Sequence, residues 1–173
     1  MPARTSRGSR RRVWPRPDAD PRLAVHRVTK ILPYAPDQLA ALVADVRAYP
    51  DFVPWVSSMR AWGEREEAPG VTVVDAEAAV GFSFLKERFS TWVRHDRHAP
   101  KVEVGLLRGP FHHLKNRWEF FPHPEGTRVE FFIDFAFKSR ILDMMLQANF
   151  DRAVGKLMHC FEARAHHLYG PKG

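Results

Sequence analysis

Residues 41–55, ALVADVRAYPDFVPW, decide how this chain folds, because an amphipathic helix runs directly into prolines interleaved with large apolar residues. Pro36 suits the first position of that helix, and Asp37 suits the positive end of its dipole. Apolar residues at three- and four-residue spacing predict one buried face, made of Leu39, Leu42, Val43 and Val46. Pro50 cannot continue the helix, so a short turn or a second brief helix should follow. It carries Tyr49, Phe52, Val53 and Trp55, which suit either the rim of a cavity or the cap of an ordinary core.

The composition predicts a near-neutral folded domain with a basic tail. The chain has 173 residues, 45% of them hydrophobic, which suits one domain with a substantial core. Of the net charge of +7, residues 1–22 supply +5 through seven arginines against two aspartates. The rest of the chain carries 20 basic and 18 acidic residues, or +2. This distribution argues against nucleic-acid binding by the folded part.

Residues 1–22 are expected to form a disordered basic tail, and residues 23–170 the folded domain. The tail combines four prolines with few large apolar residues, and it lacks the hydrophobic core of a secretory signal. It is either a solvated leader or an electrostatic tether to anionic lipid head groups. Near such a surface each basic residue contributes roughly 1 kcal/mol.

Several classes of site lack their motif in this sequence. The single Cys160 excludes an intramolecular disulfide framework and suits a core position better than a nucleophile. His95 and His98, expected in a turn before Pro100, have no second ligand pair at metal-binding spacing. No phosphate loop, nucleophile elbow or dinucleotide fingerprint occurs. We therefore expect no metal, no cofactor and no catalytic residue, and only peripheral membrane contact, since no apolar run approaches roughly 18 residues.

Short strand patterns separated by turn signals fill the middle of the chain. The expected strands cover residues 23–32, 56–65, 71–82, 86–94, 101–107, 113–121 and 127–137. Their short connections predict an antiparallel meander. Residues 139–169 keep the helical period and predict one long helix that begins at Ser139 and ends before Gly170. A curved sheet wrapped around this helix would enclose a space.

Strand alternation predicts which side chains face that space. The inner wall should be mostly apolar, with Asp75 and Glu77 facing outward. Three polar residues fall on this wall: Glu87, Thr91 and Asn116. An unpaired buried polar group costs roughly 1 to 3 kcal/mol. These three side chains either form an internal hydrogen-bond network or await a polar atom of a ligand.

Five short motifs follow one another along the domain. They are Tyr49-Pro50-x-Phe52-x-Pro54-Trp55, Glu77-Ala-Ala-Val-Gly81-Phe82, Glu87-x-Phe89-x-Thr91, Trp118-Glu-Phe120 and Phe135-x-Phe137-Lys138-Ser139. Their order resembles the START-like polyketide cyclase/dehydrase superfamily, and within it the coenzyme Q-binding proteins and their bacterial relatives, the ribosome association toxins. The resemblance implies an α+β helix-grip (START/Bet v 1-like) fold. In that fold a curved antiparallel sheet wraps around a long C-terminal helix and leaves an apolar cavity.

The resemblance also implies non-catalytic binding of ubiquinone (coenzyme Q) or a related isoprenoid lipid, in support of respiratory electron transport or quinone biosynthesis. Thr91 and Asn116 would donate hydrogen bonds to quinone carbonyls, and Glu87 would accept from a hydroxyl or a water. The mouth would lie between the Tyr49–Trp55 rim and the start of the last helix. The implied ligand-binding residues are Val43, Phe52, Trp55, Phe82, Glu87, Phe89, Thr91, Val104, Asn116, Trp118, Phe131, Ile133, Leu142 and Met145.

Two alternatives remain from the same resemblance. A ribosome association toxin would bind the large ribosomal subunit through its surface, for which the folded domain offers little net charge. A polyketide cyclase-type enzyme would need a positioned acid or base, and Glu87 is the only carboxylate predicted on the inner wall. A bacterial source would imply a cytoplasmic protein peripheral to the inner membrane. A eukaryotic source would imply the matrix side of the mitochondrial inner membrane.

Overall fold

The computed structural model describes residues 24–82 and 85–171. The expected disordered tail therefore lies outside the described residues. The strands are β1 (Ala24–Leu32), β2 (Val56–Ala68), β3 (Val71–Phe82), β4 (Leu85–Asp96), β5 (Lys101–Arg108), β6 (Phe111–His123) and β7 (Gly126–Phe137). The helices are α1 (Pro36–Ala44), α2 (Tyr49–Phe52), α3 (Arg140–Ala148) and α4 (Phe150–Tyr169), with a 3₁₀ turn at Val46–Ala48.

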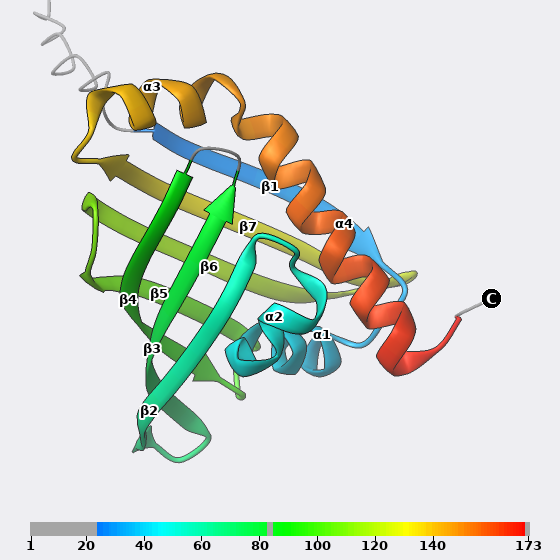
Figure 1. The fold of residues 1–173 in the computed structure, drawn as a ribbon. Helices are drawn as coiled ribbons and strands as arrows, with labels where there is room; N and C mark the ends of the chain where they lie inside the picture. The colour runs from blue at the N-terminus through cyan, green and yellow to red at the C-terminus, as the bar shows by residue number, and fades with distance from the viewer. Residues whose placement is uncertain (1–23, 83–84, 172–173) are drawn as a thin grey trace, which may run out of the picture.

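The seven described strands form one sheet in the order β1-β7-β6-β5-β4-β3-β2. Every neighbouring pair is antiparallel, so the predicted meander is confirmed, with β1 added beside β7. The sheet curves, and α4 crosses it with α1 and α2 beneath its C-terminal half (Figure 1). α3 lies beyond the other end of α4, near the end of β7. This arrangement is the helix-grip fold that the sequence predicts.

The first helix forms as predicted. Pro36 occupies the N-terminal turn of α1, and the buried residues are Leu39, Ala40, Leu42 and Val43. The chain then turns through the 3₁₀ segment into α2, the predicted second brief helix. The Tyr49 hydroxyl donates a 2.5 Å hydrogen bond to the carbonyl of Val43. This bond ties α2 back to α1 and fixes the direction of the chain after Pro50.

The prediction of one unbroken C-terminal helix is wrong, because the chain breaks at Asn149 into α3 and α4. The Asn149 side chain donates to the carbonyl of Met145 at 2.8 Å, and its backbone N–H bonds to Leu146. An asparagine that bonds locally to the backbone competes with regular helix. The predicted ends are confirmed: Ser139 Oγ accepts from the N–H of Leu142, and Gly170 adopts φ +77° after α4.

Strand alternation places the apolar residues of β3 to β7 on the concave side, as predicted. The buried residues there include Val74, Ala76, Val93, Val102, Leu114, Trp118, Phe120, Val129, Phe131 and Phe135. Asp75 and Glu77 lie on the outer face, where they pair with Arg65 at 3.4 Å and Arg60 at 2.9 Å. The Tyr169 hydroxyl donates to the carbonyl of Gln38 at 2.8 Å and fastens the end of α4 to α1.

Candidate functional site

One end of the concave face, beneath the C-terminal half of α4, is filled by aromatic side chains. Phe161 of α4 stands between the sheet and the first helices: its ring centroid is 5.1 Å from Trp118, 5.2 Å from Phe52 and 5.5 Å from Tyr49. Trp118 also contacts Phe131 at 4.5 Å. The structure thus brings three predicted site residues, Phe52, Trp118 and Phe131, around a single phenylalanine. We call this region the closed end.

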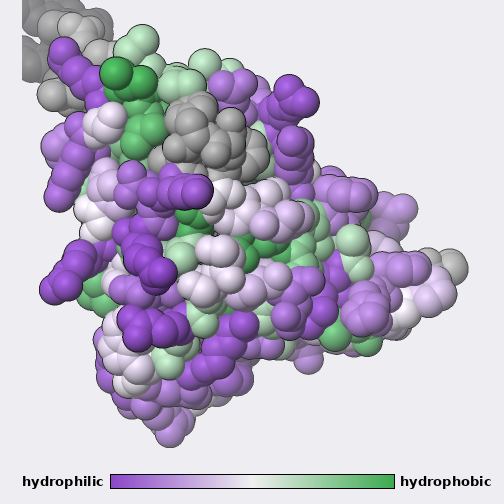
Figure 2. Space-filling model, in the orientation of Figure 1, coloured by the Kyte–Doolittle hydropathy of each residue, from purple (hydrophilic) through white to green (hydrophobic). Residues whose placement is uncertain are grey.

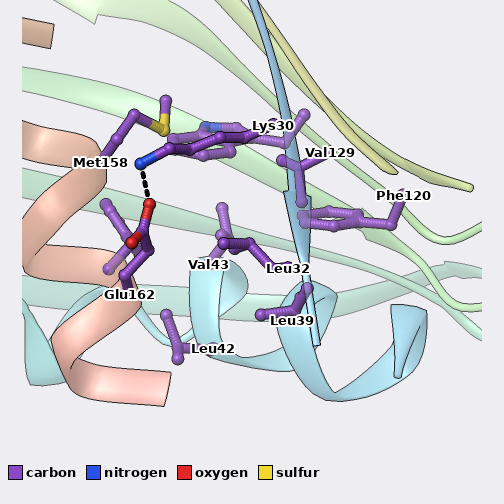
Figure 3. A pocket seen from close by; sticks show the side chains of 11 residues that line it. Lys30, Leu32, Leu39, Leu42, Val43, Phe120, Val129, Met158 and Glu162 are labelled. Atoms are coloured by element: carbon purple, nitrogen blue, oxygen red, sulfur yellow. Dashed lines mark hydrogen bonds and ion pairs between the residues drawn. The ribbon is translucent and has the colours of Figure 1, made fainter. Parts of the chain in front are cut away.

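A small apolar cavity remains inside the closed end (Figure 3). Its volume is about 20 Å³, enough for one water molecule but far below a lipid-sized tunnel. The lining side chains are Lys30, Leu32, Leu39, Leu42, Val43, Trp118, Phe120, Val129, Met158, Phe161 and Glu162. The ammonium of Lys30 and the carboxylate of Glu162 form an ion pair across it, joining β1 to α4. The roomy tunnel expected from the sequence is therefore not open here, because aromatic side chains and Met158 fill the space.

The other end of the concave face is packed less completely. Six inward-facing apolar residues contact the core yet remain only half-buried: Phe89, Val104, Leu106, Ile133, Leu142 and Leu146. The first four come from the sheet and the last two from α3. We call these six residues the open wall. Four of the predicted site residues, Phe89, Val104, Ile133 and Leu142, belong to it.

The three predicted polar residues lie on the inner face as expected, in different surroundings. Thr91 is buried, with 7% of its surface exposed. Asn116 lies between Val104 and Ile133 in the strand register, and its Oδ1 is buried with no hydrogen-bond partner. Glu87 is half-buried opposite Val80, and its side chain makes no hydrogen bond to a described residue. The three do not form the internal network that was one of the two expectations.

Two further polar residues, absent from the predicted site, face the same space. His26 of β1 pairs with Ile133 in the register, and its Nε2 lies 3.2 Å from Oε1 of Gln147 in α3. The His26 ring stacks on Phe150 with centroids 3.5 Å apart. The Nε2 of Gln147 is buried without a partner. Alternation along β1, where Val28 and Leu32 share the face of His26, was the signal that could have found the histidine.

The two sides of the expected mouth lie at different ends of α4. On the rim, Phe52 packs on Phe161, and the Arg164 guanidinium lies 5.3 Å from the Phe52 ring centroid. Trp55 is half-buried, and its carbonyl accepts from the N–H of Gly81 at 2.8 Å. Leu142 and Met145 lie on α3. The mouth stays a prediction, as does the role of Phe82, whose side chain lies outside the described residues.

α3 presents apolar side chains to solvent and buries none of its residues. Ile141 and Met144 are each 71% exposed, and Met145 is 39% exposed. Hydrophobic residues gather over α3 in the space-filling view (Figure 2). The helix that carries Leu142 and Leu146 of the open wall thus packs on the domain with only part of its apolar surface.

A polar pocket of about 220 Å³ lies beside α1, outside the predicted site. It is lined by Ala41, Ala44, Asp45, Arg47, Glu64, Thr72, Val74, Val93, His95 and Arg97. His95, expected in a surface turn, belongs instead to β4 and is half-buried, because that strand continues to Asp96. Burial, reinforced by the neighbouring Arg97, lowers the pKa of His95 below its usual value. The lowered pKa favours the neutral imidazole.

The remaining reactive groups have simple surroundings. Burial raises the pKa of the Cys160 thiol, which favours the protonated, weakly nucleophilic form. Among the described residues, no three histidine, cysteine, aspartate or glutamate side chains gather as a metal site. No helix in the described part of the chain is long and apolar enough to cross a membrane.

Comparison with known proteins places these features in a family. Residues 32–162 match the family described as polyketide cyclase/dehydrase and lipid transport. The ribosome association toxin RatA of Rickettsia prowazekii is 36% identical over 140 residues, covering 79% of this chain and 92% of that protein. The mitochondrial coenzyme Q-binding protein COQ10 homolog B of Xenopus laevis is 30% identical over 150 residues, covering 82% and 58%.

Solved structures agree with this assignment. The solution structure of an 18 kDa protein from Caulobacter crescentus is 59% identical, with a TM-score of 0.73, covering 86% of this chain and 99% of that one. The ZhuI aromatase/cyclase from Streptomyces sp. R1128 shares the fold, with 19% identity, a TM-score of 0.66 and coverage of 84% and 93%. The chain therefore belongs to the polyketide cyclase/dehydrase and lipid transport family of the START-like superfamily, as a relative of the RatA and COQ10 proteins.

Proposed function

We propose that this protein binds an isoprenoid lipid of the ubiquinone type between α3 and the concave face of the sheet, without catalysing a reaction. The open wall is the observation that supports this function. Inward-facing apolar residues of a single-domain protein are normally buried, and here six of them keep exposed surface. An apolar ligand would cover that surface.

The energetics favour an extended hydrocarbon guest. Each buried methylene-sized group contributes roughly 0.8 kcal/mol, so an isoprenoid tail supplies affinity without specific contacts. The cavity at the closed end is too small for such a tail. Binding therefore requires the first turns of α3 to move away from the sheet, while its last turn stays against β1 through the contact between Gln147 and His26. This movement is easy for a helix that buries none of its residues.

The chemistry of the inner wall supports a role without catalysis. Aldol-type cyclisation or dehydration needs an acid or base held against the substrate. Glu87 is the only carboxylate on the inner face of the described strands β3 to β7, and no second group orients it. Peripheral contact with an anionic membrane would give access to the lipid, at the inner membrane of a bacterium or of a mitochondrion.

The test is organic extraction of the purified full chain followed by mass spectrometry. Val104→Glu places a carboxylate on the open wall, and Lys115→Glu places the same group on the exposed outer face of the neighbouring strand. We expect a quinone or another isoprenoid lipid with the wild type and with Lys115→Glu, and its loss with Val104→Glu. Thermal unfolding shows whether Val104→Glu is folded. If it is not, Ile133→Trp fills the same space with an apolar ring. A folded wild type that yields no lipid and takes up no added quinone would contradict the proposal.

Association with the ribosome is the second candidate, favoured by the 36% identity to RatA. The outer face of the sheet carries Arg27 and Arg117, whose guanidinium groups lie 5.0 Å and 5.1 Å from the Phe132 ring centroid. Arginines beside an aromatic ring suit RNA backbone and bases, although Arg117 is half-buried and pairs with Glu119 at 2.8 Å. Sedimentation with large ribosomal subunits that is lost in Arg27→Glu/Arg117→Glu would support this function. Lipid binding should survive in the same variant.

A further inference from the structure

The interior of the domain contains two buried polar atoms that no described group satisfies. The Oδ1 of Asn116, on the sheet, is an acceptor without a donor. The Nε2 of Gln147, on α3, is a donor without an acceptor. A buried polar atom left unpaired is costly, and such atoms are rare in folded proteins. Both occur in the part of the molecule bordered by the open wall.

The positions of these two atoms are fixed by their neighbours. Gln147 is held through its Oε1 by His26, which is itself held against Phe150 by ring stacking. His26 and Asn116 flank Ile133 in the register, one strand to each side. Strand spacing puts the backbones of His26 and Asn116 about 10 Å apart. The half-buried Ile133 lies between them.

We infer that His26, Gln147 and Asn116 form the head-group site of the lipid named in the proposed function, and that they select a head group carrying hydroxyls. This inference rests on the proposed function and specifies its ligand. A hydroxyl donates to Oδ1 of Asn116, and a hydroxyl at the opposite edge of the ring accepts from Nε2 of Gln147. A hydroquinone has both groups, and a phenol or lipid alcohol has one. A quinone only accepts, so it leaves Oδ1 of Asn116 unpaired in the amide orientation of this structure, in which Asn116 acts as an acceptor and not as the donor expected from the sequence. Ile133 supports the face of the ring, and the tail runs along the open wall.

The experiment compares three probes on the full chain under anaerobic conditions: a short-chain ubiquinol, the matching ubiquinone and the hydrocarbon squalene. Dissociation constants come from quenching of tryptophan fluorescence. We expect ubiquinol to bind about tenfold more tightly than ubiquinone, because it satisfies one more buried polar atom. Asn116→Leu should abolish this difference between ubiquinol and ubiquinone. Gln147→Met should weaken the binding of both ubiquinol and ubiquinone and leave the binding of squalene unchanged.

The control is Met144→Leu, which alters a side chain of the same helix that is 71% exposed to solvent. It should keep the preference for ubiquinol. Equal binding of ubiquinol and ubiquinone by the wild type would overturn the inference and leave the proposed function intact, because a water then satisfies the two atoms. Failure of all three probes to bind would overturn both. Circular dichroism confirms that each variant is folded, and both substituted side chains are close in size to the originals.

Discussion

The closed end and the open wall belong to one concave surface but are built differently. At the closed end, Phe161 brings Trp118, Phe52 and Tyr49 together and leaves a cavity of about 20 Å³. At the open wall, six apolar residues stay half-buried, four of them on the sheet and two on α3, a helix with no fully buried residue. The comparison teaches that side chains seal one end of the concave surface, whereas the other end keeps exposed apolar surface. A fold can hold a binding surface open when its core is complete elsewhere.

The largest expected effect tests the closed end. Trp118→Ala should lower the free energy of unfolding by about 3 to 5 kcal/mol, because it opens a cavity in packed aromatic surroundings. Ile141→Ser, which alters a side chain 71% exposed on α3, should change it by no more than about 0.5 kcal/mol. Urea unfolding measures both. Similar losses for the two variants would mean that stability is not concentrated at the closed end.

The next effect is a gain in stability at Asn116, which lies between Val104 and Ile133 of the open wall. Asn116→Leu removes an acceptor that is buried without a partner, so the free energy of unfolding should rise by about 1 to 2 kcal/mol in the lipid-free protein. The measurement is urea unfolding of delipidated protein. Asn116→Asp, which keeps a polar group at the same site, serves as the control and should show no gain. A loss of stability in Asn116→Leu would show that Oδ1 is already satisfied.

A smaller effect separates hydrogen bonding from packing at the rim. Tyr49→Phe removes the bond to the Val43 carbonyl and should cost about 1 kcal/mol at pH 7. Burial, with a contribution from Asp45, raises the pKa of the Tyr49 hydroxyl above its usual value near 10. The unfolded tyrosine therefore ionises first, and the folded state loses stability as the pH rises above about 10. In Tyr49→Phe the free energy of unfolding should fall less as the pH rises, which urea unfolding at several pH values measures. An unchanged pH profile would assign the loss to another group.

The smallest effect concerns the ion pair that spans the closed end. Lys30 and Glu162 are 43% and 33% exposed, so Lys30→Met should cost only about 0.2 to 1 kcal/mol. The difference from the wild type should shrink in 1 M NaCl, where the Debye length is about 3 Å. Lys115→Met, at an exposed position with no ion pair to a described residue, provides the comparison. A cost that persists in high salt would indicate packing of the Lys30 stem.

The sequence by itself determined the architecture and the faces of the strands. Alternation is local and has period two, so the inward positions of Thr91, Asn116 and Trp118 followed from the residues alone. The signals that begin or end a helix are equally local, because Pro36, Pro50 and Gly170 act at their own positions in the chain. The break at Asn149 was missed because an asparagine is tolerated within a helix. Only its bonds to the preceding turn end α3 there.

Only the tertiary structure decided how full the interior is. Whether Val43 and Trp118 line a tunnel or a cavity of about 20 Å³ depends on how far the Phe161 and Met158 side chains of α4 reach into the space. The meeting of His26 with Gln147, residues 121 positions apart, likewise required the last helices to settle on β1. Periodicity assigns a residue to a face but carries no information about what packs on that face. The group formed by His26, Gln147 and Asn116 and the open wall both arise from contacts between distant segments, and such contacts exist only in the folded chain.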